Sequence, residues 1–247
     1  MSGLASLRPN YQAAVFGASG GIGAALTRLL AADENCACVH AGARGGLVTS
    51  PKIAPFHFDL TDEPSIDAAA AQISSRAGEV ELVIVATGIL HHGAMRPEKS
   101  FRALDPTFLA ESYAINAIGP ALIAKHMLPL LPRDRKSVFA ALSARVGSIS
   151  DNRLGGWHAY RAAKAALNQL IRTCAIELAV KNKPAVCVTL HPGTVDTRLS
   201  QPFQANVRAD HLFTPEYSAG RLLQVIDGLT HAQSGQFFAW DGEQIDF

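Results

Sequence analysis

The chain has few of the features that mark nucleic-acid-binding, membrane or secreted proteins. Its 247 residues carry a formal net charge of +1, and only 17% of them are charged. No basic surface for nucleic acid or an anionic membrane is therefore predicted. No apolar run approaches the roughly 18 residues of a membrane-spanning helix, and residues 1–12 lack the apolar core of a signal peptide. We expect a cytoplasmic protein with no nucleic-acid or membrane partner.

Cysteine is also scarce. The chain has four cysteines, which fall mainly in apolar stretches: Cys36, Cys38, Cys174 and Cys187. The spacing of Cys36 and Cys38 suits a shared metal poorly, and no second pair of ligands follows. We expect structural thiols and no metal site.

Hydrophobic residues, by contrast, make up 48% of the chain and recur in short runs that alternate with helical patterns. Strands are predicted at residues 13–16, 36–41, 54–58, 82–86, 138–142, 185–190 and 236–240. Helices are predicted at residues 21–31, 62–76, 105–130, 156–180 and 215–229. Several runs are hydrophobic throughout, as in strands buried on both faces of a parallel sheet. The pattern predicts an α/β fold: a single Rossmann-type doubly wound domain over residues 1–247, with a seven-stranded parallel sheet flanked by helices.

One connection in this pattern is too long to be ordinary. The Pro-, Gly- and polar-rich stretch from Pro192 to Thr214 precedes the last predicted helix, and insertions of this kind often build binding sites. Phe203, Leu212 and Phe213 make residues of about 193–214 a candidate apolar lid, and a plain surface loop is the alternative. Residues 90–97 and 154–158 are further candidates for contact with a substrate.

A glycine-rich turn follows the first predicted strand. It reads Gly17-Ala18-Ser19-Gly20-Gly21-Ile22-Gly23 and runs directly into an Ala- and Leu-rich helix. Glycines let the backbone approach a pyrophosphate, whose charge is stabilised by the N–H groups and dipole at a helix start. The spacing differs from Gly-x-Gly-x-x-Gly, but its place in the first strand–helix unit predicts a dinucleotide site.

The end of the second predicted strand indicates which dinucleotide. An Asp or Glu is expected there in an NAD enzyme, to bind the ribose, but the strand ends Ala41-Gly42-Ala43-Arg44. Arg44 could pair with a 2′-phosphate, and the alternative is a solvated surface arginine. NADP(H) is therefore the preferred cofactor, with NAD(H) possible.

Tyr160 and Lys164 lie four residues apart in a strongly helix-forming run. They therefore share one helix face. A phenol with an ordinary pKa of about 10 is a poor acid or base near neutrality, and a neighbouring cation favours its ionised form. The pair is a candidate general acid/base, and the alternative is an ordinary helix pair.

The Gly-x-x-x-Gly-x-Gly loop and the Tyr-x-x-x-Lys pair, about 140 residues apart, resemble those of the short-chain dehydrogenase/reductase family. The resemblance covers essentially the whole chain. It is closest to the branch of C-factor-like and Sniffer-type carbonyl reductases, through residues 147–149 and 155–160. Three further landmarks match in order: Asp59-Leu60, which resembles the adenine contact; Asn116, which matches the helix Asn of the catalytic tetrad; and the Pro-Gly segment at residues 192–197, which resembles the nicotinamide contact.

The sequence departs from the family pattern in two places. The usual Asn-Ala-Gly after the fourth strand is Ala86-Thr87-Gly88 here, and Ala86 cannot make the side-chain hydrogen bonds of that Asn. The catalytic serine is also ambiguous, because the usual position falls on Ala144. Ser143 is the preferred candidate, Ser148 is the first alternative, and a catalytic role for neither serine is the second.

The resemblance implies NADP(H)-dependent reduction of an aldehyde or ketone on a small apolar substrate, through Tyr160, Lys164, Ser143 and Asn116. The implied cofactor contacts are Gly17, Ser19, Gly20, Gly21, Ile22, Gly23, Arg44, Asp59, Leu60, Ala86, Thr87, Gly88, Asn116, Tyr160, Lys164, Pro192, Gly193, Val195 and Thr197. The alternative is a nucleotide-binding regulatory or signalling protein of C-factor type with little turnover. The helices at 105–130 and 156–180 match those through which family members associate, so a homodimer or homotetramer is expected.

Overall fold

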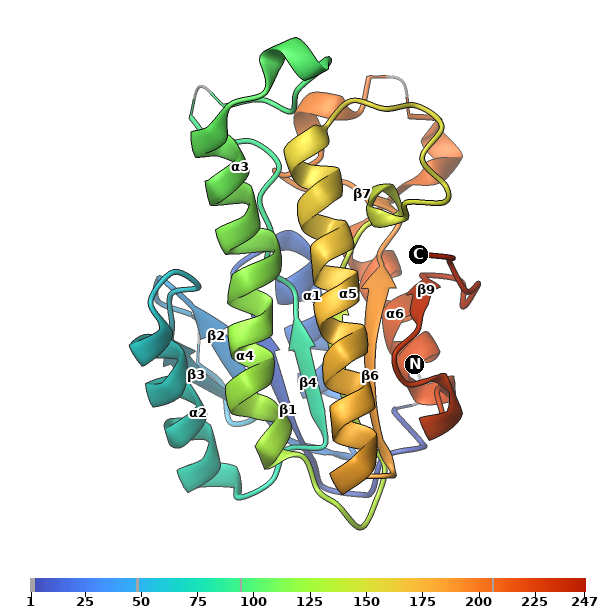
Figure 1. The fold of residues 1–247 in the computed structure, drawn as a ribbon. Coiled ribbons are helices and arrows are strands. Elements are labelled where there is room, and N and C mark those ends of the chain that lie inside the picture. The colour runs from blue at the N-terminus through green and yellow to red at the C-terminus, as the bar shows by residue number, and fades with distance from the viewer. Residues whose placement is uncertain (1–2, 48, 94, 206) are drawn as a thin grey trace.

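The computed structural model describes residues 3–47, 49–93, 95–205 and 207–247. Seven parallel strands form one sheet in the order β3-β2-β1-β4-β5-β6-β9, with helices on both faces (Figure 1). The strands are β1 (Tyr11–Phe16), β2 (Cys36–Ala43), β3 (Ile53–His57), β4 (Leu82–Val85), β5 (Ser137–Leu142), β6 (Ala185–His191) and β9 (Phe237–Ala239). The predicted single doubly wound α/β domain is confirmed, and each predicted strand overlaps an observed one.

Two hydrophobic cores lie on opposite faces of the sheet. The α-helices are α1 (Gly21–Ala32), α2 (Glu63–Ala77), α3 (Pro106–Tyr113), α4 (Gly119–Met127), α5 (His158–Lys181) and α6 (Pro215–Gly228). Alternate strand residues such as Val15 and Ile84 pack against α1 and α6, and their neighbours such as Phe16 and Val85 pack against α2, α4 and α5. Because side chains alternate across a strand, continuous hydrophobic runs fill both cores.

The helix predicted over residues 105–130 is divided. A π-helical turn (Ala114–Ile118) separates α3 from α4, and Gly119 N donates to the carbonyl of Ala114, five residues earlier. Pro120 has no N–H to donate to the carbonyl of Asn116, so the regular α-helical ladder cannot continue there. The turn carries Asn116 in its middle, and such turns often occur at functional sites.

The helix predicted to begin at residue 156 begins instead at His158. Gly155, Gly156 and Trp157 all have left-handed backbones, with φ of +63°, +66° and +52°. Three consecutive residues of this kind cannot form a right-handed helix. The sequence pair Gly155-Gly156 is the signal for the delay.

The segment predicted as a lid has structure of its own. Two short strands, β7 (Thr194–Val195) and β8 (Leu212–Phe213), pair in parallel and join its ends. Two 3₁₀ turns, at Gln201–Phe203 and Ala209–His211, lie between them. Within the described residues, no helix is both long and apolar enough to cross a membrane.

Candidate active site

The candidate residues gather at one edge of the sheet. The neighbouring strands β1, β4, β5 and β6 are parallel and end at Phe16, Val85, Leu142 and His191. The residues that follow are the glycine loop, Ala86, Ser143 and Pro192. Open parallel sheets bind ligands at this carboxyl edge, where the strand order reverses.

The glycine loop turns tightly and packs closely on its neighbours. The N–H groups of Gly17 and Ala18 donate to the Gly42 carbonyl at 3.0 and 2.9 Å, and Gly17 has a φ of +93°. A Cβ at Gly17 would lie 3.0 Å from the Ala86 carbonyl, and one at Gly23 would lie 2.1 Å from the Gly17 oxygen. Helix α1 begins at Gly21 with no side-chain cap. Its first N–H groups are therefore suited to an anionic ligand.

Two other segments predicted to contact the cofactor, those of Thr87 and Thr197, pack against the glycine loop. A Cβ at Gly21 would lie 2.6 Å from Cγ2 of Thr197, and one at Gly17 would lie 3.0 Å from Cγ2 of Thr87. Within the described residues, the buried Oγ1 of Thr87 has no hydrogen-bond partner. A buried hydroxyl of this kind suits a ligand that supplies the missing partner.

Asn116 is fully buried and holds the loop after β4. Its Oδ1 accepts from Ile89 N at 3.0 Å, and its Nδ2 donates to Ile89 O at 2.9 Å and to Ser112 Oγ at 3.2 Å. A Cβ at Gly88 would lie 3.2 Å from Asn116 Oδ1 and 3.7 Å from Lys164 Nζ. The Asn116 amide and the Lys164 amine therefore both lie close to Gly88.

Tyr160 and Lys164 lie on the buried face of α5, one turn apart, and are 8% and 2% exposed. Lys164 Nζ lies 5.8 Å from the centre of the Tyr160 ring and donates to the Leu142 carbonyl at 2.9 Å. Burial lowers the pKa of Lys164 to about 7 and raises the pKa of Tyr160. The direction for Tyr160 is opposite to the expectation from a neighbouring cation, because burial removes the phenolate from water.

The two serine candidates differ in their partners. Within the described residues, Ser143 Oγ is buried and has no hydrogen-bond partner, while its backbone N–H is fixed to Leu190 O at 2.7 Å. Ser148 Oγ lies 3.3 Å from Ser150 Oγ and accepts from Asp151 N at 3.2 Å. Ser143 therefore has a hydroxyl available to a ligand, and Ser148 serves a local turn.

The residues predicted to bind the adenosine half lie at the ends of β2 and β3. Arg44 follows β2 and is exposed. The Asp59 carboxylate accepts from Thr61 N at 2.8 Å and Thr61 Oγ1 at 2.7 Å, and these bonds lower its pKa, with a smaller contribution from the Arg44 charge. Leu60 packs at Gly119, where a Cβ would lie 2.7 Å from Leu60 Cδ2.

An aromatic wall connects Tyr160 to the lid. The Trp157 ring centre lies 6.4 Å from that of Tyr160 and 5.1 Å from that of Phe203, which in turn lies 5.8 Å from His91. Ala94 and Asn206, in two of the segments predicted to contact substrate, lie outside the described residues. Two residues of this region, Glu98 and Ser112, had no signal in the sequence.

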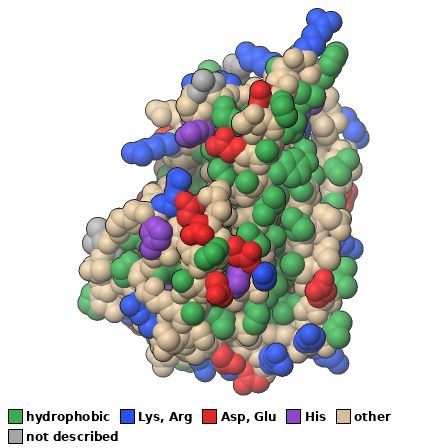
Figure 2. Space-filling view, turned by 60° about the vertical axis from the view of Figure 1, so that its left-hand side comes forward, with side chains coloured by type: hydrophobic (Ala, Val, Ile, Leu, Met, Phe, Trp, Pro, Cys, Tyr) green, Lys and Arg blue, Asp and Glu red, His purple; other side chains and the backbone are tan. Residues whose placement is uncertain are grey.

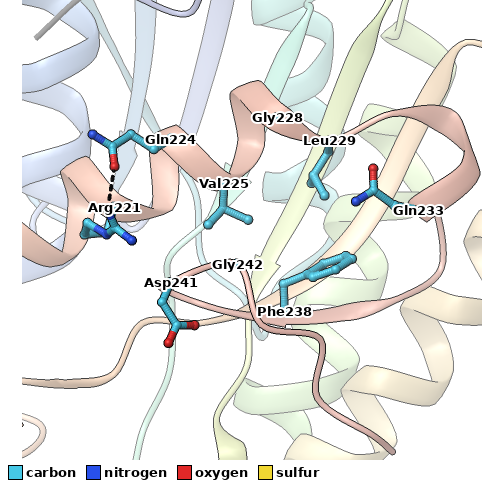
Figure 3. Close-up of a pocket in the computed structure, with 9 residues that line it drawn as sticks. All are labelled: Arg221, Gln224, Val225, Gly228, Leu229, Gln233, Phe238, Asp241 and Gly242. Atoms are coloured by element: carbon cyan, nitrogen blue, oxygen red, sulfur yellow. Dashed lines mark hydrogen bonds between the residues drawn. The ribbon is translucent and has the colours of Figure 1, made fainter.

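A separate depression of about 270 Å³ lies on the outer side of the domain, between α6 and the turn after β9 (Figure 3). Its lining includes Arg221, which donates to Gln224 Oε1 at 3.0 Å, together with Phe238 and Asp241. None of the residues that line it is a predicted site residue. Within the described residues, no group of three or more His, Cys, Asp or Glu side chains could hold a metal ion.

Comparisons with known proteins agree with this geometry. The short chain dehydrogenase family profile matches residues 12–208. A 1-hydroxy-2-glutathionyl-2-methyl-3-butene dehydrogenase of Rhodococcus sp. (strain AD45) is 31% identical, over 92% of this chain and 96% of the relative. The C-signal protein of Myxococcus xanthus is 35% identical, over 58% of this chain and 80% of that relative.

Solved structures agree as well. The NADPH-bound carbonyl reductase from chicken fatty liver superposes with a TM-score of 0.83 and 27% identity, over 98% of this chain and 95% of that one. The carbonyl reductase Sniffer of D. melanogaster shares the fold, with a TM-score of 0.81 and 23% identity, over 96% of this chain and 99% of that one.

The fold and the glycine loop are those of the Rossmann-type class of dinucleotide-binding proteins. The chain belongs to the short-chain dehydrogenase/reductase family of enzymes.

Proposed function

We propose that this enzyme reduces an aldehyde or ketone on a small apolar molecule to an alcohol, with NADPH as the preferred reductant. The observation that carries the proposal is the group of Ser143, Tyr160 and Lys164 at the carboxyl edge of the sheet. In that group a buried serine hydroxyl, which has no hydrogen-bond partner among the described residues, accompanies a buried phenol and a buried lysine.

Each side chain has a defined role in this proposal. Ser143 donates a hydrogen bond to the substrate oxygen, and Tyr160 gives that oxygen its proton as the carbonyl carbon is reduced. The nicotinamide, when bound, supplies the hydride. A positioned acid of this kind contributes roughly 10²–10⁴-fold to the rate.

Lys164 and Asn116 support the proton transfer. A charged Lys164 stabilises the developing phenolate of Tyr160 and would hold the nicotinamide ribose. Asn116 would seat a water that connects Lys164 to solvent for return of the proton. The bonds from Asn116 to Ile89 fix the loop after β4 on which this arrangement depends.

The residues of the glycine loop and the strand ends fit a dinucleotide. At Gly17, Gly21 and Gly23 the loop packs so closely that a Cβ would clash with Ala86, Thr197 or the Gly17 carbonyl, and the start of α1 offers N–H groups to the pyrophosphate. Arg44 is proposed to pair with the 2′-phosphate of NADPH, because it is exposed at the end of β2 where an NAD enzyme would carry an acid. Pro192, Gly193, Val195 and Thr197 are proposed to face the nicotinamide, with residues 193–214 as the lid.

The decisive experiment follows oxidation of NADPH and, in parallel, NADH with a panel of aldehydes and ketones. We expect turnover that favours NADPH. Tyr160→Phe should abolish turnover while NADPH binding survives, and Tyr217→Phe, a change at a 47% exposed tyrosine, should leave turnover intact. Normal turnover in Tyr160→Phe would overturn the assignment.

Arg44→Ala tests the choice of cofactor. Because hydrogen bonds to charged groups are worth about 1.5–3 kcal/mol, NADPH binding should weaken roughly 10- to 100-fold and NADH binding should barely change. Arg153→Ala, at another exposed arginine, is the matched control. Equal losses for both cofactors would exclude recognition of the 2′-phosphate.

A regulatory function with little turnover is the second candidate. Its support is the likeness to the protein named C-signal. Tight NADPH binding without turnover on any carbonyl of the panel would favour it.

Association of copies through α4 and α5 is also proposed. Ile176 and Val180, one turn apart on α5, are 63% and 78% exposed, and Ile118 before α4 is 51% exposed. Figure 2 shows hydrophobic side chains gathered on the side of the molecule where α4 and α5 lie. Exposed apolar surface of this kind often marks an interface.

A further inference from the structure

The entry to α5 has a feature that neither the fold nor the proposed chemistry requires. Trp157 is the N-cap residue of the helix, has a φ of +52° and provides no side-chain cap. Glycine adopts this conformation freely, as Gly155 and Gly156 do, but a bulky aromatic residue keeps it only where its surroundings hold it.

Glu98 holds the Trp157 backbone in this conformation. It is 3% exposed and lies in the segment between β4 and α3. Its carbonyl accepts from Trp157 N at 2.6 Å, and both oxygens of its carboxylate lie 3.3 Å from Ala159 N. The carboxylate thus replaces the missing cap, and its charge complements the positive end of the helix.

Ala159 is also held at its carbonyl. The Ala159 carbonyl accepts from Ser112 Oγ at 3.3 Å, and Ser112 Oγ accepts from Asn116 Nδ2 at 3.2 Å. Ala159 directly precedes Tyr160. The backbone that positions the phenol is therefore held by Glu98 at the N–H and by the Ser112–Asn116 pair at the carbonyl.

The strained backbone directs the Trp157 indole between Tyr160 and the lid. Its ring lies edge-on to both Tyr160 and Phe203, with interplanar angles of 70° and 61°. A right-handed residue at this position would project its side chain in another direction. The ring contacts with Tyr160 and Phe203 offset part of the cost of the left-handed turn, and they place a flat apolar surface beside the proposed acid.

We propose that Trp157 is the specificity-determining wall of the substrate site, and that Glu98 is the positioning residue that holds it there. The favoured substrate class is a carbonyl attached to a flat, apolar group, such as an aromatic or conjugated aldehyde, which stacks on the indole. The inference rests on the proposed carbonyl reduction at Tyr160.

The test compares benzaldehyde with acetaldehyde. Because an aromatic pair contributes about the free energy of a tenfold rate change, Trp157→Gly should lower the ratio of kcat/KM for benzaldehyde over acetaldehyde roughly tenfold. Trp157→Phe should restore most of the ratio, and Trp240→Phe, at the second tryptophan of the chain, should not change it. An unchanged ratio in Trp157→Gly would overturn the role of the indole.

The positioning role of Glu98 is tested by kcat and by the Kd for NADPH. Glu98→Ala should lower kcat for both aldehydes while the Kd for NADPH stays constant, and Glu98→Gln, which keeps one acceptor for Ala159 N, should recover part of the loss. Glu111→Gln, on α3, is the control. Wild-type kcat in Glu98→Ala would exclude the positioning role, and if Glu98→Ala does not fold, wild-type kcat in Glu98→Asp excludes it instead.

A fluorescence measurement separates failure of this inference from failure of the proposed function. In a Trp240→Phe background Trp157 is the only tryptophan. Glu98→Ala should then shift its emission to the red, because the released indole gains contact with water. A shift without turnover in the wild-type protein would support the Glu98–Trp157 arrangement and reject carbonyl reduction. An unshifted spectrum would reject the arrangement.

Discussion

Ser143 and Ser148 are the two candidates for the catalytic serine, yet within the described residues only one of them has a hydroxyl without a hydrogen-bond partner. Ser143 Oγ is buried without a partner in the described residues, whereas Ser148 Oγ is bonded within its own turn. We expect Ser143→Ala to lower kcat by roughly 10²–10³, the usual effect of removing one donor to a developing oxyanion. Ser148→Ala, the matched control, should keep kcat within a few-fold, and the reverse result in steady-state assays would transfer the role to Ser148.

Lys164 makes stability depend on pH. Its folded pKa of about 7 lies below its ordinary value of 10.5, so between these pH values the unfolded chain binds more protons than the folded one. Stability should therefore rise from pH 7 towards pH 9. The raised pKa of Tyr160 acts oppositely only near and above pH 10.

Thermal melts of wild type and Lys164→Met from pH 6 to 9 provide the check. The wild-type melting temperature should rise across this range relative to that of the variant, which lacks the titrating group. His40 and His191, with pKa values lowered by burial to about 4, contribute a similar rise confined to about pH 4–6.5. Parallel curves for the two proteins above pH 7 would show that Lys164 is not a buried titrating group.

The candidate site residues could be predicted where they belong to a motif, but their burial and contacts could not. The family resemblance made Tyr160, Lys164 and the glycine loop candidates, and the helical period predicted that Tyr160 and Lys164 share a face. The direction of the Tyr160 pKa shift did not follow, since it depends on how deeply the phenol is buried. The capping role of Glu98 could not be predicted either, because the helix that it caps begins 60 residues later in the chain.

At the level of elements, two helices with similar starting sequences differ in their caps. Thr214 accepts from Tyr217 N at 3.2 Å at the start of α6, whereas Asp62 at the start of α2 makes no side-chain cap bond. Thr214→Ala should lower the free energy of unfolding by about 1 kcal/mol. Asp62→Ala should cost less, and urea denaturation of both variants measures the difference; equal losses would mean that the cap bond does not decide stability.

The positions of the helices and strands could be predicted from apolar periodicity. The interruptions of two helices could not, because they depend on a proline and on left-handed residues that a periodic pattern does not register. The break at residues 114–118 depends on Pro120, which a periodic pattern passes over. The late start of α5 depends on three left-handed residues, only two of which are glycines. Both interruptions lie beside proposed site residues, where local strain is commonly retained.

At the scale of the whole molecule, the exposed apolar face of α5 predicts self-association. Ile176→Glu combined with Val180→Glu should convert the assembled protein to a monomer, because two charges would be buried at the interface. Light scattering coupled to size-exclusion chromatography gives the mass. Leu154→Glu, a change at a 93% exposed loop residue, should leave the mass unchanged, and a wild-type monomer would remove the proposal.

The strand order also divides the chain into two parts that meet at the β1–β4 pair. The glycine loop, Arg44 and Asp59 belong to the part before β4, and Asn116, Ser143, Tyr160 and Lys164 to the part after it. A nicotinamide dinucleotide bound as proposed contacts both parts of the chain. A ligand that binds only when the two parts are associated stabilises their association by mass action. A chain cut at the exposed turn of Gly78 and Glu79 would then become a split protein whose two fragments are held together by the cofactor.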